Sequence, residues 1–149
     1  ELTRRDQGMT DTQMYVPHTL FESAGYSRQR AAGGITILRV GDARPETINA
    51  WYEDCKKLMA VWPGSPRLRY LHDIRHAGLP TLHATERVSQ VLRRMRYIPV
   101  FDARGAILVN NPTLAELLAS VMKRRPRADW QVRCFSDESA ALAWLRIDN

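Results

Sequence analysis

The sequence has few of the features that mark an extracellular, membrane-spanning or metal-dependent protein. Its 149 residues include two cysteines, too few for a disulfide framework and not arranged as C-x-x-C. No stretch approaches the roughly 20 apolar residues that span a bilayer, and the polar N-terminus lacks the apolar core of a signal peptide. These absences favour a cytoplasmic protein in which Cys55 and Cys134 are buried free thiols.

Signatures of catalysis are missing as well. There is no G-x-S-x-G nucleophile elbow, and the Gly33-Gly34 pair precedes a predicted strand rather than the helix that a phosphate-binding loop requires. His72 and His76 flank Asp73 near a predicted strand end, and His83 could approach from the next helix, but no set of ligands has a diagnostic metal-binding spacing. We therefore expect a protein that is not an enzyme and has neither a metal site nor a cofactor.

Positive charge is in excess, with a formal net charge of +6. Much of it falls in two basic runs at predicted helix ends, composed of Arg93, Arg94 and Arg96 in one and Lys123, Arg124, Arg125 and Arg127 in the other. Cations there stabilise the negative end of a helix dipole, which is the interpretation we favour. Attraction to nucleic acid or anionic lipid is the alternative, although no aromatic residues interleave with the basic ones as a base-stacking surface would need.

Apolar periodicity predicts a single α/β domain over residues 18–149, preceded by a flexible leader, or sequence added for expression, at 1–17. Apolar and β-branched runs predict strands, in chain order at 19–23, 26–31, 35–40, 68–74, 106–109 and 130–135. A hairpin is expected across 32–34, where glycines supply positive φ, and a turn at 102–105.

Apolar stripes at three- and four-residue spacing predict helices between these strands. The helices are expected to begin near Pro45, Thr81, Pro112, and Ser136 or Asp137. An aromatic stripe on the first helix is better explained by packing on a sheet than by a ligand pocket. Together the elements predict a mixed, mainly parallel sheet of about four to five strands, with about four helices mainly on one face.

Polar residues follow two of the predicted strands. Asp73, Arg75 and His76 come at or after the end of one, and Asn110 and Asn111 after another. Open α/β sheets bind ligands beyond the carboxyl ends of their strands, and a helix beginning at Asn111 would offer N–H groups to an anion. These five residues form the predicted binding rim. The structural alternative is an ion pair within a loop beside a simple helix cap.

Three segments resemble the STAS-like superfamily, and more narrowly the bacterial proteins related to anti-sigma factor antagonists. They are Leu71–Arg75, the run Ala106–Val109 with its following helix, and the ending Val132–Leu145, which contains Ser-Asp-Glu followed by an Ala- and Leu-rich helix. The similarity extends over about Tyr26 to Ile147, and its motifs are largely core positions.

The resemblance implies a non-enzymatic role: binding a partner protein or, in some relatives, a nucleotide or lipid-like ligand. Antagonists of this superfamily carry a phosphorylatable serine before the second helix, where this chain has Gly78–His83. Thr81 or Thr85 is the candidate substitute. We therefore expect a regulatory module that acts by protein–protein contact through the rim. The alternatives are a small-ligand or lipid-binding domain with an interior cavity at the first and third helices, and a basic nucleic-acid-binding protein. A homodimer through a sheet edge is compatible with the sequence but not required by it.

Overall fold

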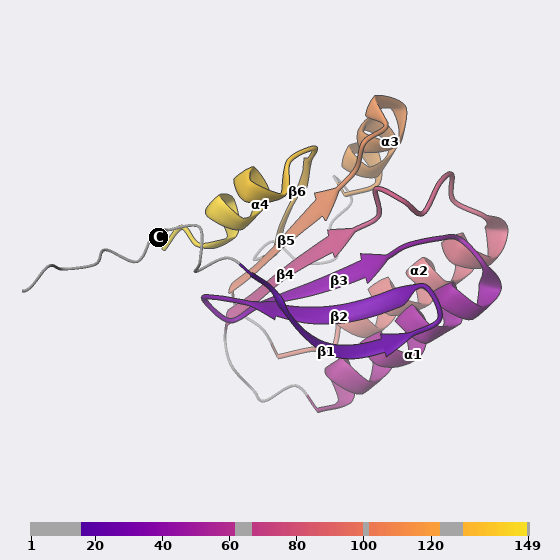
Figure 1. Ribbon diagram of the computed structural model, residues 1–149, viewed down its shortest axis with the longest axis horizontal. Coiled ribbons are helices and arrows are strands. Elements are labelled where there is room, and N and C mark those ends of the chain that lie inside the picture. The colour runs from indigo at the N-terminus through magenta and orange to yellow at the C-terminus, as the bar shows by residue number, and fades with distance from the viewer. Residues whose placement is uncertain (1–15, 62–66, 100–101, 123–129, 149) are drawn as a thin grey trace, which may run out of the picture.

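The computed structural model describes residues 16–61, 67–99, 102–122 and 130–148 (Figure 1). Its elements follow the order β1 (His18–Ser23), β2 (Tyr26–Ala31), β3 (Ile35–Val40), α1 (Pro45–Ala60), β4 (Arg67–Asp73), α2 (Leu82–Met95), β5 (Asp102–Leu108), α3 (Pro112–Met122), β6 (Trp130–Phe135) and α4 (Glu138–Leu145). Two predictions lie wholly or mostly outside the described residues: the leader, predicted over 1–17, of which 1–15 are not described, and the basic run at 123–127.

The strands form one six-stranded sheet whose order is the order of the chain, β1 to β6. β1 and β2, and β2 and β3, pair antiparallel, whereas β3 to β6 pair parallel. The predicted mixed sheet is therefore confirmed, but the expected four to five strands is too few. The predicted hairpin joins β2 to β3, and its Gly33 and Gly34 have φ of 86° and 74°, a region that glycine enters without a Cβ penalty.

The predicted turn at residues 102–105 is wrong, because these residues begin β5. A buried arginine and a glycine are uncommon in strand interiors, which is why the sequence favoured a turn. Arg104 is nevertheless 4% exposed and donates through Nη1 to the carbonyls of Trp144 and Ile147 at the end of α4. Its guanidinium therefore satisfies carbonyl groups at a helix C-terminus.

The helices cover the two faces of the sheet unequally (Figure 1). Side chains of α1, α2 and α3 pack on one face, as the prediction of helices mainly on one face requires. α4 packs alone on the other, against a core that includes Ile37, Leu71 and Leu108. Successive side chains of β4 point to opposite faces of the sheet. Tyr70 and His72 face α1 and α2, and Leu71 faces α4.

Helix starts follow their capping residues. Pro45 occupies the first turn of α1, and the side chains of Thr81, Asn111 and Asp137 accept backbone N–H hydrogen bonds at the starts of α2, α3 and α4. Cys55 is a buried free thiol, as predicted, and burial raises its pKa; Cys134 is partly buried. None of the helices in the described ranges is long and apolar enough to cross a membrane.

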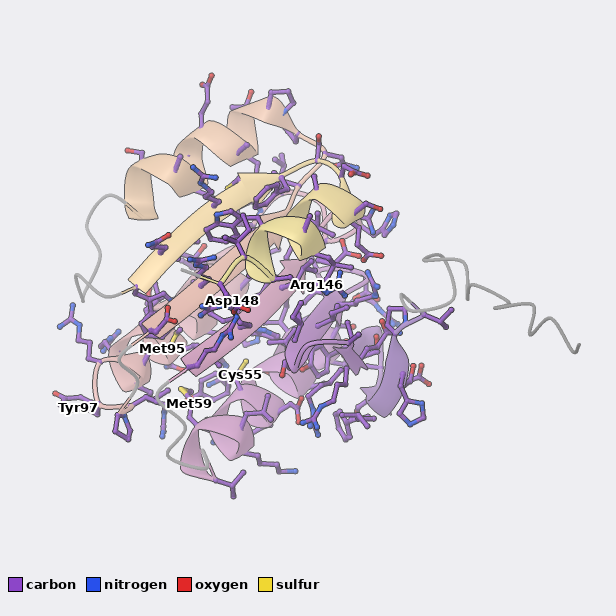
Figure 2. All side chains as sticks on the ribbon, turned by 90° about the vertical axis from the view of Figure 1, so that its left-hand side faces the viewer. Cys55, Met59, Met95, Tyr97, Arg146 and Asp148 are labelled. Atoms are coloured by element: carbon purple, nitrogen blue, oxygen red, sulfur yellow. The ribbon has the colours of Figure 1, made fainter. Side chains whose placement is uncertain are left out.

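The helical face is filled at one end and hollow at the other. Met59 of α1 and Met95 of α2, labelled in Figure 2, pack with Ile98 and Ala103 where the parallel strands begin. Methionine fills irregular gaps well, and this end has a continuous apolar core. Farther along the parallel strands, a pocket lies between the same helices and the sheet.

Candidate functional site

The predicted binding rim is brought together by the sheet. Asp73 lies in register with Leu108, so the residues following β4 and β5 emerge at the same end. The Asp73 carboxylate accepts hydrogen bonds from Arg39 Nη1 at 2.8 Å and from Arg75 Nε and Nη2, both at 2.9 Å. Arg39 also pairs with Glu138 at the start of α4. Asp73 is 3% exposed, and this ion-pair network joins β3, β4 and α4.

The network controls the ionisation of Asp73. Burial acts to raise the pKa of this carboxyl, but the hydrogen bonds from Arg75 and Arg39 outweigh burial and hold the pKa at about 2. The carboxylate is therefore the stable form across the physiological pH range. The hydrogen bonds that this carboxylate accepts all come from within the protein. This favours the structural alternative, an ion pair within a loop, for this part of the rim.

Replacing Asp73 by asparagine should lower the free energy of unfolding at pH 7 by about 2 kcal/mol, because two partly exposed arginines lose their shared carboxylate. Urea unfolding measures this difference. The native pKa is depressed, so the contribution is complete above pH 3.8 and is lost as pH falls toward about 2. The difference in free energy of unfolding between wild type and variant should narrow in that pH window. A difference that does not change with pH would contradict the depressed pKa assigned to Asp73.

The other predicted site residues are exposed or act as caps. His76 and Asn110 are exposed, and Asn111 Oδ1 accepts from the backbone N–H of Thr113 at 2.9 Å. Thr81 caps α2, and the Thr85 hydroxyl donates to the Thr81 carbonyl at 2.9 Å. Both threonines are exposed, and their phosphorylation stays a prediction, as does partner binding by the rim. His83 does not join His72 and His76: its Nε2 is 2.8 Å from Asn49 Oδ1. Within the described ranges, no three His, Cys, Asp or Glu side chains are grouped to hold a metal ion.

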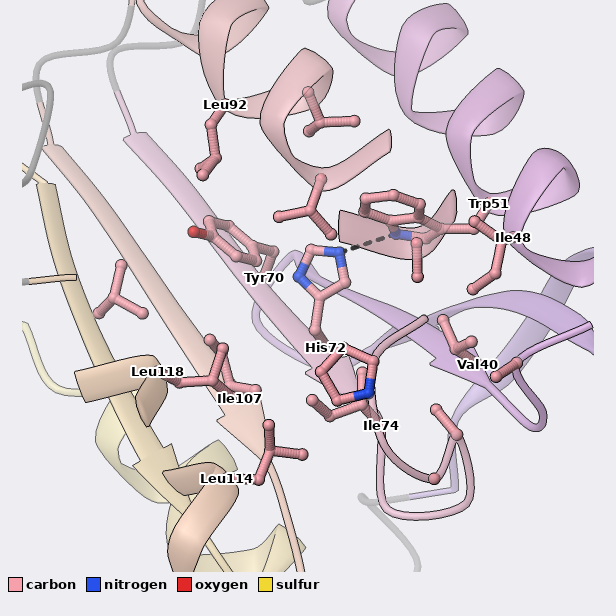
Figure 3. A pocket seen from close by; sticks show the side chains of 18 of the residues that line it. Val40, Ile48, Trp51, Tyr70, His72, Ile74, Leu92, Ile107, Leu114 and Leu118 are labelled. Atoms are coloured by element: carbon pink, nitrogen blue, oxygen red, sulfur yellow. Dashed lines mark hydrogen bonds between the residues drawn. The ribbon is translucent and has the colours of Figure 1, made fainter. Parts of the chain in front are cut away.

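A feature that the favoured interpretation of the sequence did not include is a pocket of about 220 Å³ between the sheet and helices α1, α2 and α3 (Figure 3). Its walls are apolar or aromatic, and they include Val40, Ile48, Trp51, Tyr70, His72, Ile74, Val88, Val91, Leu92, Ile107, Leu114, Leu118 and Trp130. In the part of the chain that the structure describes, no Asp, Glu, Lys or Arg lines it. The loop Ala77–Pro80 forms one side, and Gly78, Leu79 and Pro80 are exposed, which places that wall next to solvent.

His72 projects from β4 into this pocket (Figure 3). Its Nε2 lies 3.1 Å from Trp51 Nε1 of α1, and the two rings meet edge to face. An indole nitrogen only donates, so Nε2 accepts and the proton of the neutral ring resides on Nδ1. Burial lowers the pKa of His72 to about 4, and the ring is therefore neutral at pH 7. No described residue accepts a hydrogen bond from Nδ1, the ring nitrogen that faces away from Trp51 in Figure 3.

Tyr70 reaches across the floor of the pocket from β4 to β6. Trp130 Nε1 donates to its hydroxyl at 3.1 Å, and β5 lies between the two strands. The ring crosses β5 at Gly105, where a Cβ atom would overlap with Cζ and the hydroxyl of Tyr70. A strand glycine of this kind allows close approach of another group. Burial raises the pKa of Tyr70, so the hydroxyl stays protonated.

Two signals in the sequence point to this pocket. A histidine and a tyrosine alternate on the helical face of β4, and a glycine occupies the register position beside that tyrosine on β5. The first-helix stripe contributes Trp51 to the pocket, while Cys55 packs in the core. The cavity anticipated at the first and third helices is present, with α2 as an additional wall.

Comparison with known proteins shows similarity at the level of the fold. No family model matches the sequence, and no curated protein matches it. A solved structure, an uncharacterised protein of the DUF3478 family with a SpoIIAA-like fold from Shewanella loihica PV-4, is similar with a TM-score of 0.61 and 17% sequence identity. The match covers 87% of this chain and 95% of that chain. The chain thus has a SpoIIAA-like fold, which confirms the kind of fold that the resemblance implied.

Proposed function

We propose that this protein is a non-enzymatic binding module that holds a small apolar molecule in the pocket between its sheet and helices α1–α3. The supporting observation is a 220 Å³ apolar space inside a domain of ordinary size. Protein interiors are close-packed, so an apolar space of this volume beside an exposed loop is a candidate binding site. A ligand that fills the space would remove the apolar surface of its walls from water.

The chemistry of the walls supports binding rather than catalysis. Small-molecule sites are lined mainly by apolar and aromatic side chains with a few polar groups that fix orientation. Here the polar groups include the neutral rings of His72 and Tyr70 and the indoles of Trp51 and Trp130. His72 has no carboxylate beside it to raise its basicity, and burial lowers its pKa away from the range useful for proton transfer at pH 7.

Two tryptophan substitutions on α2 test the proposal. Val88 lines the pocket and is partly exposed, so Val88→Trp should fill the space and weaken toluene binding at least tenfold. Leu82, on the same helix, is 78% exposed and does not line the pocket, so Leu82→Trp is the matched control and should bind as wild type does. NMR titration with toluene measures both, with saturable shifts expected for the amides of β4 and β5. Absence of toluene binding by wild type, or equal binding by the two variants, would overturn the proposal.

A second candidate is regulatory protein–protein contact through the rim, with which a SpoIIAA-like fold is compatible. The exposed His76 and Asn110 support it, because both present side chains to solvent at one end of the sheet. Arg75→Glu is a poor test, since Arg75 donates to Asp73 and a second carboxylate there would also destabilise the fold. His76→Glu leaves the ion-pair network intact. If it removes a partner from a pull-down without lowering the melting temperature, the rim is the contact surface, and unchanged capture would exclude His76 from that surface.

A further inference from the structure

Among the polar groups that line the pocket, the His72 ring is the one whose donor atom the geometry fixes. His72 Nε2 is held by Trp51, which fixes the proton on Nδ1 and makes that atom a donor. Nδ1 of His72 is not among the fully buried, unpartnered side-chain atoms of the described residues, so it opens onto the space of the pocket, where a ligand oxygen would accept from it in place of water. The Tyr70 hydroxyl lies on the β6 side of the pocket floor, where it accepts a hydrogen bond from the indole N–H of Trp130.

The walls also discriminate against charge. No acidic or basic residue is among the described residues that line the pocket, and the His72 ring is neutral at pH 7. The nearest large ion-pair network, around Asp73, lies on the α4 face of the sheet and is internally paired. A carboxylate, phosphate or ammonium group that entered the pocket would lose its hydration without gaining an ionic partner. Fatty-acid anions and phospho-ligands are thus poor candidates for the interior.

The volume limits the size of the ligand. An apolar cavity of about 150 Å³ binds benzene, and scaling by volume gives on the order of nine non-hydrogen atoms for a space of 220 Å³. Such a molecule corresponds to a substituted aromatic ring or a short branched chain. A long acyl chain would have to extend out of the pocket past the loop Ala77–Pro80.

Provided that the pocket is a ligand site as proposed above, we infer that it selects uncharged, mostly apolar molecules with one hydrogen-bond acceptor, such as a ketone or ester carbonyl, which accepts from Nδ1 of His72. The hydrocarbon part contacts the walls supplied by α1, α2 and α3. The carbonyl oxygen points to the floor, toward β4. Trp51 acts as a positioning residue, because its indole determines which nitrogen of His72 donates.

Three probe molecules of nearly identical shape separate the contributions of apolar contact, the hydrogen bond and ligand charge to the binding free energy. α-Methylstyrene, acetophenone and benzoate contain the same number of non-hydrogen atoms and differ in having a CH₂ group, a neutral carbonyl or a carboxylate. Their dissociation constants are measured by NMR titration at pH 7. Acetophenone should bind about five-fold more tightly than α-methylstyrene, the value of one net hydrogen bond, and at least about ten-fold more tightly than benzoate.

Two variants assign the preference to an atom. His72→Phe removes the donor, and it should bring acetophenone to the affinity of α-methylstyrene while hydrocarbon binding persists. Tyr70→Phe removes a second donor, the hydroxyl on the pocket floor. It should leave the five-fold preference for acetophenone over α-methylstyrene unchanged. Because His72→Phe leaves the Trp51 indole without its acceptor, His72→Gln is the rescue variant: its amide can accept from Trp51 and donate to the ligand, and it should restore part of the preference.

The outcomes distinguish the two levels of the proposal. If none of the three probes binds, the pocket is not a ligand site of this size, and both the proposed function and the inferred ligand class fail. If the hydrocarbon binds as well as the ketone, if benzoate binds best, or if Tyr70→Phe rather than His72→Phe removes the preference, ligand binding stands and the role of His72 is overturned. Preference for acetophenone that depends on His72 supports both.

Discussion

Replacing Gly105 by alanine is expected to lower the free energy of unfolding by about 3 kcal/mol. The new Cβ would overlap with the far end of the Tyr70 ring, which lies across β5 at this point. The ring cannot move without loss, because its hydroxyl accepts from Trp130 and its edges meet the rings of His72 and Trp130. Urea unfolding followed by circular dichroism measures the effect, and toluene binding should weaken with it because Tyr70 forms the pocket floor.

A double-mutant cycle shows whether the cost comes from Tyr70. In the Tyr70→Leu background no ring crosses β5, so adding Gly105→Ala should cost less than about 1 kcal/mol. The coupling between the two positions would then account for most of the 3 kcal/mol. An equal cost of Gly105→Ala in both backgrounds would mean that the glycine is needed for its backbone alone, and the close approach would not be the reason for it.

Acid should destabilise the protein through His72 well before the carboxylates titrate. In the unfolded chain this imidazole takes up a proton near pH 6.5, whereas burial keeps the folded pKa at about 4. The unfolded state therefore binds more protons as pH falls, and the stability present above pH 6.5 declines by up to about 3 kcal/mol as pH approaches 4. Protonation also removes the acceptor at Nε2, so that Trp51 would face a second donor.

Urea midpoints measured at several values between pH 7 and pH 4 test this dependence. His72→Gln cannot be protonated and should flatten the curve over that range, even though its stability at pH 7 is lower. His76→Gln, which replaces an exposed histidine on the loop after the same strand, is the control and should keep the wild-type slope. A wild-type slope in His72→Gln would show that another group controls acid stability. The contribution of Asp73 belongs to a lower window, from pH 3.8 to about 2.

The parts of the fold that follow local rules were predictable from the sequence. Alternation along β4 placed Tyr70 and His72 on one face and Leu71 and Asp73 on the other, because side chains in a strand alternate with period two. The pair Gly33-Gly34 marked the hairpin, and capping residues marked the helix starts. The convergence of Asp73 with Asn110 and Asn111 also followed from parallel pairing, which aligns the ends of β4 and β5.

Features that depend on distant partners were not predictable in the same way. Asp73 is partnered by Arg39, 34 positions away in the sequence, and Arg39 by Glu138, 99 positions away, so the pairing of these charges has no local signal. The start of β5 was mistaken for a turn because its buried arginine and its glycine are each explained by contacts from other elements. Arg104 reaches the carbonyls at the end of α4, and Gly105 accommodates the Tyr70 ring.

The sequence predicted the pocket only under the ligand-binding alternative, and the reason is geometric. Periodicity shows which side of each helix is apolar, and it therefore predicts that these sides face the sheet. It does not show how far a helix is separated from the sheet or at what angle it crosses. The apolar faces of α1, α2 and α3 were expected to meet in a filled core, whereas they enclose a space whose existence depends on all three helix positions together.

The order of the strands has a consequence for how the chain acquires its structure. Every strand pairs only with its immediate predecessor and successor in the sequence, from β1 to β6. A ribosome releasing this chain from its N-terminus would supply each strand just as the growing edge of the sheet becomes available, without waiting for a distant segment. The pocket, however, needs side chains of α3 and β6. During synthesis, the sheet can grow stepwise while the pocket is completed only near the end, so a chain that stopped before α3 would lack two of the elements that line the pocket.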